Sequence, residues 1–311
     1  MINFETSNPS GALCLGAAVG TFFGGGKVGI SSDHTPHSRM LTRAVLSGLL
    51  SSGSQPYIFG KQTLPAARCA ARFYDLSCCI HLYWDSEMKT PATCVRLISG
   101  NGTDASAQTE QTISDITGGG EFSFMQPSAV KEGTYAESFR YEYMQALFDR
   151  MPKKTMRKNL EVQTSSLTVS NLLETVLSVI EQTMPGKAAP EFKAKIYPDG
   201  ERFNLYTNSG KTVERELRFK LTIILLSHFC PGGTVVLPYD SPLSLKTLII
   251  GSGGRIEYAD QKKDKFMESI FEYGSEMQFR LFYDGIYFVI MLLAYLNDKN
   301  ISFEKLIGMI I

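Results

Sequence analysis

The chain of 311 residues has no excess of either charge and no long apolar run, and each absence argues against a class of protein. Its 31 Lys and Arg residues balance 31 Asp and Glu residues. No overall positive field is therefore available to attract nucleic acid or an anionic membrane. The longest apolar stretch, Ile286–Leu296, is shorter than the roughly 18 residues that a membrane-spanning helix needs. We expect neither a nucleic-acid nor a membrane partner.

The six cysteines show neither a CxxC pair nor the histidine spacing of a zinc site. Reduced, buried thiols are the expectation, since the cysteines lie in apolar surroundings. The N-terminus also lacks the basic and apolar regions that mark a signal peptide. With 43% apolar residues, the composition is that of an ordinary globular protein, and we expect a cytoplasmic one.

Short strands alternate with helices along most of the chain. In the first part, strands are predicted at Lys27–Ile30, Tyr57–Phe59 and Cys78–Tyr83, with helices around Met40–Leu49 and Leu64–Tyr74 between them. This alternation predicts βαβ units and an α/β fold with mixed, mostly parallel sheets sandwiched by helices. The segment from residue 99 to residue 133 is rich in Gly, Ser, Thr and Asp, which favours a loop or linker.

Two breaks in composition divide the chain into three predicted domains. The first follows the Gly- and Ser-rich segment near residue 133, and the second is Cys230-Pro231-Gly232-Gly233. We therefore expect domains at residues 1–133, which include the linker, at residues 134–231 and at residues 232–311.

Several segments resemble, in the same order, motifs of the alpha-D-phosphohexomutase superfamily, which includes phosphoglucomutase and phosphomannomutase. The segment Gly29–Leu41 is similar to the first-domain motif GRDTRPSSEML, and Ile196–Arg202 lies where the family has its magnesium loop FDGDADR. A count without gaps back from Val95-Arg96-Leu97 places the phosphoserine loop TASHNP over Trp84–Lys89. Third-domain motifs are matched at Gly232–Val236, Gly253–Arg255, Asp264–Met267 and Asp284–Ile286. The resemblance implies three tandem domains of the phosphohexomutase type, the second of them shortened.

The sequence also departs from the family pattern. The sugar-specificity loop GGEQSGH has no counterpart between Lys265 and Asp284, and the chain ends at Ile311, after the helix that closes the third domain. The resemblance therefore implies that the fourth, phosphate-binding domain is absent. A face that once packed on that domain would be a surface for a homo-oligomer or another protein partner.

The resemblance also implies a set of site residues. Ser86 falls on the family's phosphoserine nucleophile, and Arg96 lies where the family has a lysine able to act as general acid or base. Arg202 matches an arginine able to hold a substrate phosphate. Ser86, Asp199 and Glu201 would hold Mg²⁺, weakly, because Tyr197 stands in place of the first carboxylate of the loop.

Each of these roles has an alternative that the sequence leaves open. Tyr197–Arg202 also fits a solvated Pro-Asp-Gly turn without a metal. Ser86 lies between Asp85 and Glu87, whose charges would repel a transferred phosphate, so it also fits a surface serine. Arg202 also fits a simple ion pair with Asp199 or Glu201.

These departures lead to a function hypothesis. We expect a phosphohexomutase-like pseudoenzyme of carbohydrate metabolism that binds a hexose phosphate or a protein partner, because losses among groups that act together compound. The alternative is an active isomerase, an intramolecular phosphotransferase on hexose phosphates that uses Ser86 and Mg²⁺. A third hypothesis is a structural paralogue that assembles with a full-length mutase.

Overall fold

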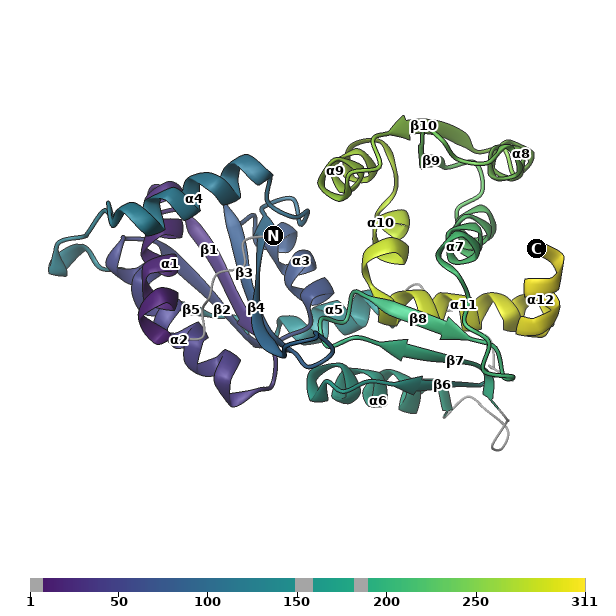
Figure 1. Ribbon diagram of the computed structural model, residues 1–311, viewed down its shortest axis with the longest axis horizontal. Helices are drawn as coiled ribbons and strands as arrows, with labels where there is room; N and C mark the ends of the chain where they lie inside the picture. The colour runs from purple at the N-terminus through teal and green to yellow at the C-terminus, as the bar shows by residue number, and fades with distance from the viewer. Residues whose placement is uncertain (1–7, 149–158, 182–189, 311) are drawn as a thin grey trace. The chain divides into compact units, whose positions relative to one another are not determined.

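The computed structural model describes residues 8–148, 159–181 and 190–310 (Figure 1). The chain forms two compact units, Met1–Gln145 with Ser165–Thr168 and Ala146–Thr164 with Val169–Ile311. The described residues contain three separate sheets, one in the first unit and two in the second. The predicted domains at residues 1–133, 134–231 and 232–311 stay a prediction.

The first unit is built on a five-stranded sheet in the order β4-β3-β1-β2-β5. Its strands are β1 (Lys27–Ser32), β2 (Gln55–Lys61), β3 (Cys78–Asp85), β4 (Ala92–Ser99) and β5 (Thr134–Tyr135). Parallel pairing joins β1 to β2, β1 to β3 and β2 to β5, whereas β4 is antiparallel to β3. The predicted α/β fold with mostly parallel sheets is confirmed in this unit.

Helices cover both faces of this sheet. They are α1 (Pro9–Phe22), α2 (Pro36–Ser51), α3 (Leu64–Phe73), α4 (Ala107–Gly119) and α5 (Phe139–Phe148), with a short 3₁₀ turn at Pro127–Ala129. Figure 1 shows α1 and α2 on one side of the sheet and α3 on the other. One core lies between the sheet and α1, α2 and α4, and it includes Leu15, Ile30, Leu49, Ile80 and Ile113.

Local signals explain where these helices begin. Asn8, Thr35 and Thr63 cap α1, α2 and α3, each accepting a hydrogen bond from a backbone N–H of the first turn. Each of the three helices also has proline in one of its first two positions, where the missing N–H costs nothing. Cap and proline together fix the start of each helix after a loop.

The expectation of a loop or linker, with at most a small edge hairpin, at residues 99–133 is wrong over Ala107–Gly119, which forms α4. Ser106 caps the helix, Ile113 is buried in the core, and Gly120 ends the helix in the left-handed conformation. The helix was not predicted because the composition of the segment is polar and only a few apolar side chains of α4, such as Ile113, pack against the core.

The second unit contains a three-stranded sheet in the order β6-β7-β8. Its strands are β6 (Asn159–Gln163), β7 (Pro190–Ile196) and β8 (Phe203–Tyr206), with β6 parallel and β8 antiparallel to β7. The helices that follow these strands or close the chain are α6 (Leu167–Glu181), α7 (Arg215–Phe229), α11 (Gly285–Lys299) and α12 (Phe303–Ile310). The sheet packs on the last two through the ring pairs Phe203–Phe288, 4.6 Å apart, and Phe192–Phe303, 5.1 Å apart.

A smaller parallel sheet in the same unit pairs β9 (Thr234–Pro238) with β10 (Arg255–Ala259). The connection between them is α8 (Leu243–Gly251), and β10 is followed by α9 (Lys263–Tyr273) and α10 (Glu276–Tyr283). Val236, Met267, Ile270 and Phe279 form the core beneath this sheet. Within residues 8–148, 159–181 and 190–310, no single helix has the length and apolar character to cross a membrane. The helices α10 and α11 have that length and apolar character only when taken together, and they are bent by 108° relative to each other.

The cysteines form no disulfide among the described residues. Cys78 and Cys79 are buried on β3, as expected. The other four cysteines are only partly buried, which corrects the expectation that all six are buried.

Candidate functional site

The carboxyl end of β1, the central strand of the first sheet, is a position where a ligand is expected to bind. Strand β1 has β2 on one side and β3 on the other, and in open α/β sheets ligands bind outside the carboxyl ends of strands where the winding reverses. Asp33 follows β1, and Ser86 follows β3. The two residues therefore lie at the edge of the sheet where a ligand is expected.

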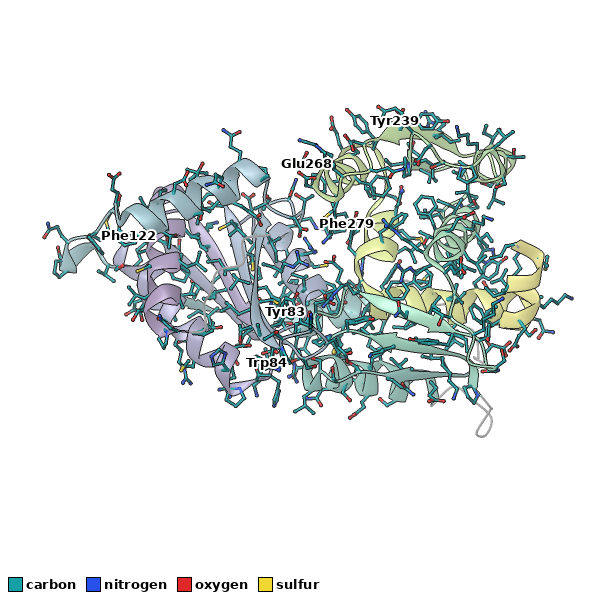
Figure 2. All side chains as sticks on the ribbon, in the orientation of Figure 1. Tyr83, Trp84, Phe122, Tyr239, Glu268 and Phe279 are labelled. Atoms are coloured by element: carbon teal, nitrogen blue, oxygen red, sulfur yellow. The ribbon has the colours of Figure 1, made fainter. Side chains whose placement is uncertain are left out.

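Asp33 ties these two strand ends together. It is buried, and its Oδ1 accepts hydrogen bonds from the N–H of Thr35 at 3.0 Å and from the Thr35 hydroxyl at 2.8 Å. Its Oδ2 accepts the N–H of Trp84 at 2.8 Å, which lies near the end of β3 (Figure 2). Asp33 thus fixes the backbone that leads into the turn of Ser86.

Ser86 lies exposed in the turn after β3. Its Oγ is 3.0 Å from the Oγ of Ser165, which belongs to the same unit and also lies 3.4 Å from Oε1 of Glu87. Asp85 is buried and accepts the N–H of Glu87 at 3.1 Å. The hydroxyl is accessible, but carboxylates flank it on both sides, which disfavours a phosphate dianion at this position.

Arg96 lies on β4, opposite His81 of β3. Ala92, the partner of Asp85 at the end of the ladder, lies four positions from Arg96, or about 13 Å along a strand. Burial lowers the pKa of the His81 imidazole, and the positive charge of Arg96 contributes a smaller lowering. The structure therefore places Arg96 beside His81 and not in the turn of Ser86, and its proposed catalytic role stays a prediction.

The second candidate feature is the loop at residues 197–202, between β7 and β8, which we call the carboxylate loop. The N–H of Gly200 donates to the carbonyl of Tyr197, and the N–H of Tyr197 donates to the carbonyl of Arg202, each at 2.9 Å. Pro198 suits the second position of such a turn, and Gly200 takes a φ of +79° that other residues rarely adopt. The Pro-Asp-Gly letters fold into the tight turn that their chemistry predicts.

Asp199 is the centre of this loop and is only 1% exposed. Its Oδ1 accepts the N–H groups of Glu201 and Arg202, each at 2.9 Å. Its Oδ2 accepts the Nε–H of Arg202 at 2.5 Å. Burial raises the pKa of this carboxyl above its ordinary value, and the Arg202 charge opposes that rise. Both oxygens are therefore engaged by groups of the loop itself.

Glu201 is also buried, and its charge is met from another element. The ammonium of Lys263, at the start of α9, lies 2.8 Å from Oε1 of Glu201. The side chain of Glu201 is 6% exposed and that of Lys263 is 43% exposed. Nothing in the sequence pattern singled out Lys263, although it directly precedes the matched segment Asp264–Met267.

Two cations lie over the ring of Tyr197, which stands where the family has the first carboxylate of the loop. The Arg202 guanidinium lies 4.9 Å and the Lys195 ammonium 5.4 Å from the centroid of the Tyr197 ring. The Tyr197 hydroxyl accepts a hydrogen bond from the Asn204 amide at 3.2 Å. This position therefore attracts positive charge through a ring face and offers no carboxylate oxygen.

The donor set of the carboxylate loop does not fit Mg²⁺. This ion requires oxygen ligands in a near-octahedral shell and binds through carboxylates whose charge is available to it. Here Asp199 is paired with Arg202 and Glu201 with Lys263. Within the ranges that the structure describes, no group of three His, Cys, Asp or Glu side chains is placed to hold a metal ion.

The structure brings only part of the predicted site together. Asp199, Glu201 and Arg202 meet in one loop of the second unit, and Arg202 forms the ion pair with Asp199 that the sequence left open as an alternative. Ser86 and Arg96 belong to the first unit. A site that joins Ser86 to the carboxylate loop stays a prediction.

Comparison with known proteins finds a matching family model and several relatives of this chain. Residues 1–123 match the family model described as phosphoglucomutase/phosphomannomutase, alpha/beta/alpha domain I. A probable phosphoglucosamine mutase of Pyrococcus abyssi is 41% identical over 71 residues, which are 23% of this chain and 16% of that protein. A phosphopentomutase of Thermococcus kodakarensis is 25% identical over 281 residues, which are 81% of this chain and 62% of that protein. The chain is thus similar to the phosphohexomutase superfamily, and the family model matches its residues 1–123.

The whole described fold is similar to that of a solved structure from the same family. A crystal structure of a phosphoglucomutase/phosphomannomutase family protein from Burkholderia thailandensis superposes with a TM-score of 0.80 and 16% identity, covering 100% of this chain and 78% of that one. At this identity the likeness concerns the fold alone. The chain spans less than two thirds of the length of the two curated relatives. Residues 1–123, which match the family model, contain both Asp33 and the turn of Ser86.

Proposed function

We propose that this phosphohexomutase-superfamily chain binds sugar phosphates but has lost efficient phosphoryl transfer. The curated relatives are named phosphoglucosamine mutase and phosphopentomutase, and both names refer to sugar phosphates. The ligand class proposed for this chain follows from that relationship.

The observation that supports the loss of phosphoryl transfer is that both acids of the carboxylate loop are already paired with cations. Phosphoryl transfer depends on positioning and on neutralising the charge that develops on the equatorial oxygens. Here Tyr197 replaces one carboxylate, and the two acids that remain, Asp199 and Glu201, are paired with Arg202 and Lys263. A loop whose own charges are already compensated is poorly suited to gather a metal and a phosphate for transfer.

The turn of Ser86 supports the same proposal. A phosphoserine at residue 86 would carry close to two negative charges at neutral pH. Glu87 is the next residue, and its carboxylate is in contact with Ser165, whose hydroxyl also contacts Ser86. Phosphorylation would therefore place like charges within a few ångströms of each other and would be disfavoured.

The test is phosphorylation of the intact chain. Purified protein is incubated with glucose 1,6-bisphosphate and Mg²⁺, and its intact mass is measured beside Ser86→Ala and Ser165→Ala. Ser165 is the matched control, because its hydroxyl lies 3.0 Å from that of Ser86. We expect no added phosphate in any of the three proteins, together with a rise in melting temperature on adding hexose phosphate.

The alternative outcomes separate the remaining functions. One added phosphate that is lost in Ser86→Ala and kept in Ser165→Ala would overturn the proposal in favour of an active phosphotransferase. No added phosphate and no thermal response to any hexose phosphate would overturn sugar-phosphate binding.

A protein partner is the second candidate function, and one surface favours it. Tyr239, in the turn that follows β9, and Leu243 and Ile250, on α8, are 69%, 76% and 65% exposed, and Figure 2 shows Tyr239 projecting outward near the end of β9. Large apolar side chains that lie together and face water are typical of an interface. Light scattering of the wild-type chain and of Leu243→Asp checks this: we expect an oligomer that the charged variant dissociates, and a wild-type monomer would contradict self-association.

A further inference from the structure

Two cations lie at the carboxylate loop, where the superfamily resemblance places a divalent metal: Arg202 matches the arginine of the family motif, whereas Lys263 is not part of that motif. Lys263 reaches the carboxylate loop from α9, and its ammonium is 2.8 Å from Glu201. Arg202 is part of the loop and is 2.5 Å from Asp199. The two acids and the two cations form two close pairs with equal and opposite charge.

The burial of the acids makes these pairs hard to displace. Asp199 and Glu201 are 1% and 6% exposed, so losing its partner would leave either carboxylate poorly solvated. An incoming metal would also have to lie beside the displaced Lys263 ammonium, whose charge would repel it. A Lys263 ammonium held at Glu201 and a bound divalent metal therefore exclude each other at this loop.

The other charges around the loop favour an anion. Lys195 and Arg202 both lie against the Tyr197 ring, so the cations at the loop outnumber its two buried acids by one. Lys263 and Arg202 are 43% and 44% exposed, so each keeps contact with solvent. A phosphate ester can therefore approach these cations from the solvent side.

We propose that Lys263 takes the place of the divalent metal at the carboxylate loop, where Tyr197 has replaced the first carboxylate, so that the loop excludes metal and accepts a phosphate ester on Lys263 beside Arg202. Exclusion of metal stands on the Lys263–Glu201 ion pair and on the loss of a carboxylate at Tyr197. The phosphate ester as ligand rests on the proposed function, and the two parts have separate tests.

The first test measures metal binding without substrate. Mn²⁺ is titrated into the full chain, and free Mn²⁺ is followed by electron paramagnetic resonance. We expect no binding up to millimolar Mn²⁺ by the wild type, at least tenfold tighter binding by Lys263→Met, and the wild-type result for Lys263→Arg, which retains the charge.

The matched control is Lys265→Met, on the same helix. Lys265 pairs with Glu268 on the surface, at 3.1 Å, so its loss should leave Mn²⁺ exclusion unchanged. Circular dichroism confirms that each variant is folded. Tight binding by the wild type that Glu201→Gln abolishes would overturn the proposal, and failure of folded Lys263→Met to gain binding would overturn the role of Lys263.

The second test compares the thermal shift caused by glucose 6-phosphate in EDTA and in Mg²⁺. Equal shifts in the two conditions support direct binding to the cations, and a shift that appears only with Mg²⁺ overturns it. No shift in either condition overturns the proposed sugar-phosphate function, while the Mn²⁺ titration still decides whether the loop excludes metal.

Discussion

The side-chain amide of Gln278 makes both hydrogen bonds that a neighbouring strand would make to Val236. Its Oε1 accepts the N–H of Val236 at 3.0 Å, and its Nε2 donates to the carbonyl of Val236 at 2.7 Å. Gln278 lies on α10 and is fully buried. One edge of the sheet of β9 and β10 is thus paired, at this residue, by a helix side chain in place of a strand.

Replacing Gln278 by Met should therefore destabilise the second unit. The two backbone groups of Val236 would lose their partner while buried, and each unsatisfied buried group costs about 1–3 kcal/mol. We expect the free energy of unfolding to fall by about 3 kcal/mol in urea denaturation. The exposed Gln111→Met, on α4, should change it by no more than about 0.5 kcal/mol; equal effects of the two variants would contradict the role assigned to Gln278.

This pairing shows where prediction from sequence ends. The apolar, β-branched residues at Thr234–Leu237 indicate a strand by themselves, and β9 includes all of them. The glutamine that pairs with the strand edge follows Val236 by 42 residues, on the short helix α10. Local pattern identifies the strand, whereas the partner of its edge depends on tertiary packing.

The candidate site divides in the same way. The turn at Tyr197–Gly200 follows from Pro-Asp-Gly letters whose backbone preferences are local. The partner of Glu201 does not follow, because Lys263 lies 62 residues further along the chain, and the ion pair forms only when α9 packs near the loop. Sequence alone therefore identified the acids but left open whether they hold a metal or belong to a turn without one, and it did not point to Lys263.

A second prediction concerns the close packing of α1 against α2. A Cβ at Gly48 would lie 2.1 Å from the carbonyl oxygen of Leu13 and 2.6 Å from the N of Ala17. Both atoms are backbone and cannot move aside, so Gly48→Ala should cost at least about 1–3 kcal/mol of unfolding free energy.

Gly118 on α4 is the matched control for this substitution. A Cβ there meets nothing within 4 Å, and alanine is the better helix former by about 0.5–1 kcal/mol. Gly118→Ala should therefore raise the free energy of unfolding while Gly48→Ala lowers it. Two changes of the same sign would show that helix propensity, and not the approach of α1, governs Gly48.

A third prediction compares a buried with an exposed ion pair. The Arg68 guanidinium is 1% exposed and lies 2.5 Å from Asp104, whereas Lys265 and Glu268 are 58% and 39% exposed. Asp104→Ala leaves a buried charge without that partner and should cost about 3–5 kcal/mol. Glu268→Ala should cost less than about 1 kcal/mol. Urea denaturation of both variants measures the difference, and similar losses would contradict the importance of burial.

The last prediction is a pH dependence that originates at His81. Burial on β3 lowers the pKa of His81 from 6.5 to about 4, against the attraction of Asp33 and with help from Arg68 and Arg96. Its Nδ1 is 2.9 Å from the Ser31 hydroxyl. The unfolded chain takes up this proton below pH 6.5 and the folded chain only near pH 4, so His81 contributes stability above pH 6.5 that is lost as the pH falls towards 4.

At about 1.4 kcal/mol per pKa unit, this loss amounts to about 3 kcal/mol. We expect the free energy of unfolding, measured in urea from pH 7 to pH 4, to fall less steeply for His81→Asn than for the wild type. Asparagine keeps a polar atom near Ser31 and does not titrate, and the carboxyl groups of both proteins contribute equally, so the difference between the two curves isolates His81. Parallel curves would show that the imidazole takes up its proton in the folded chain as readily as in the unfolded one.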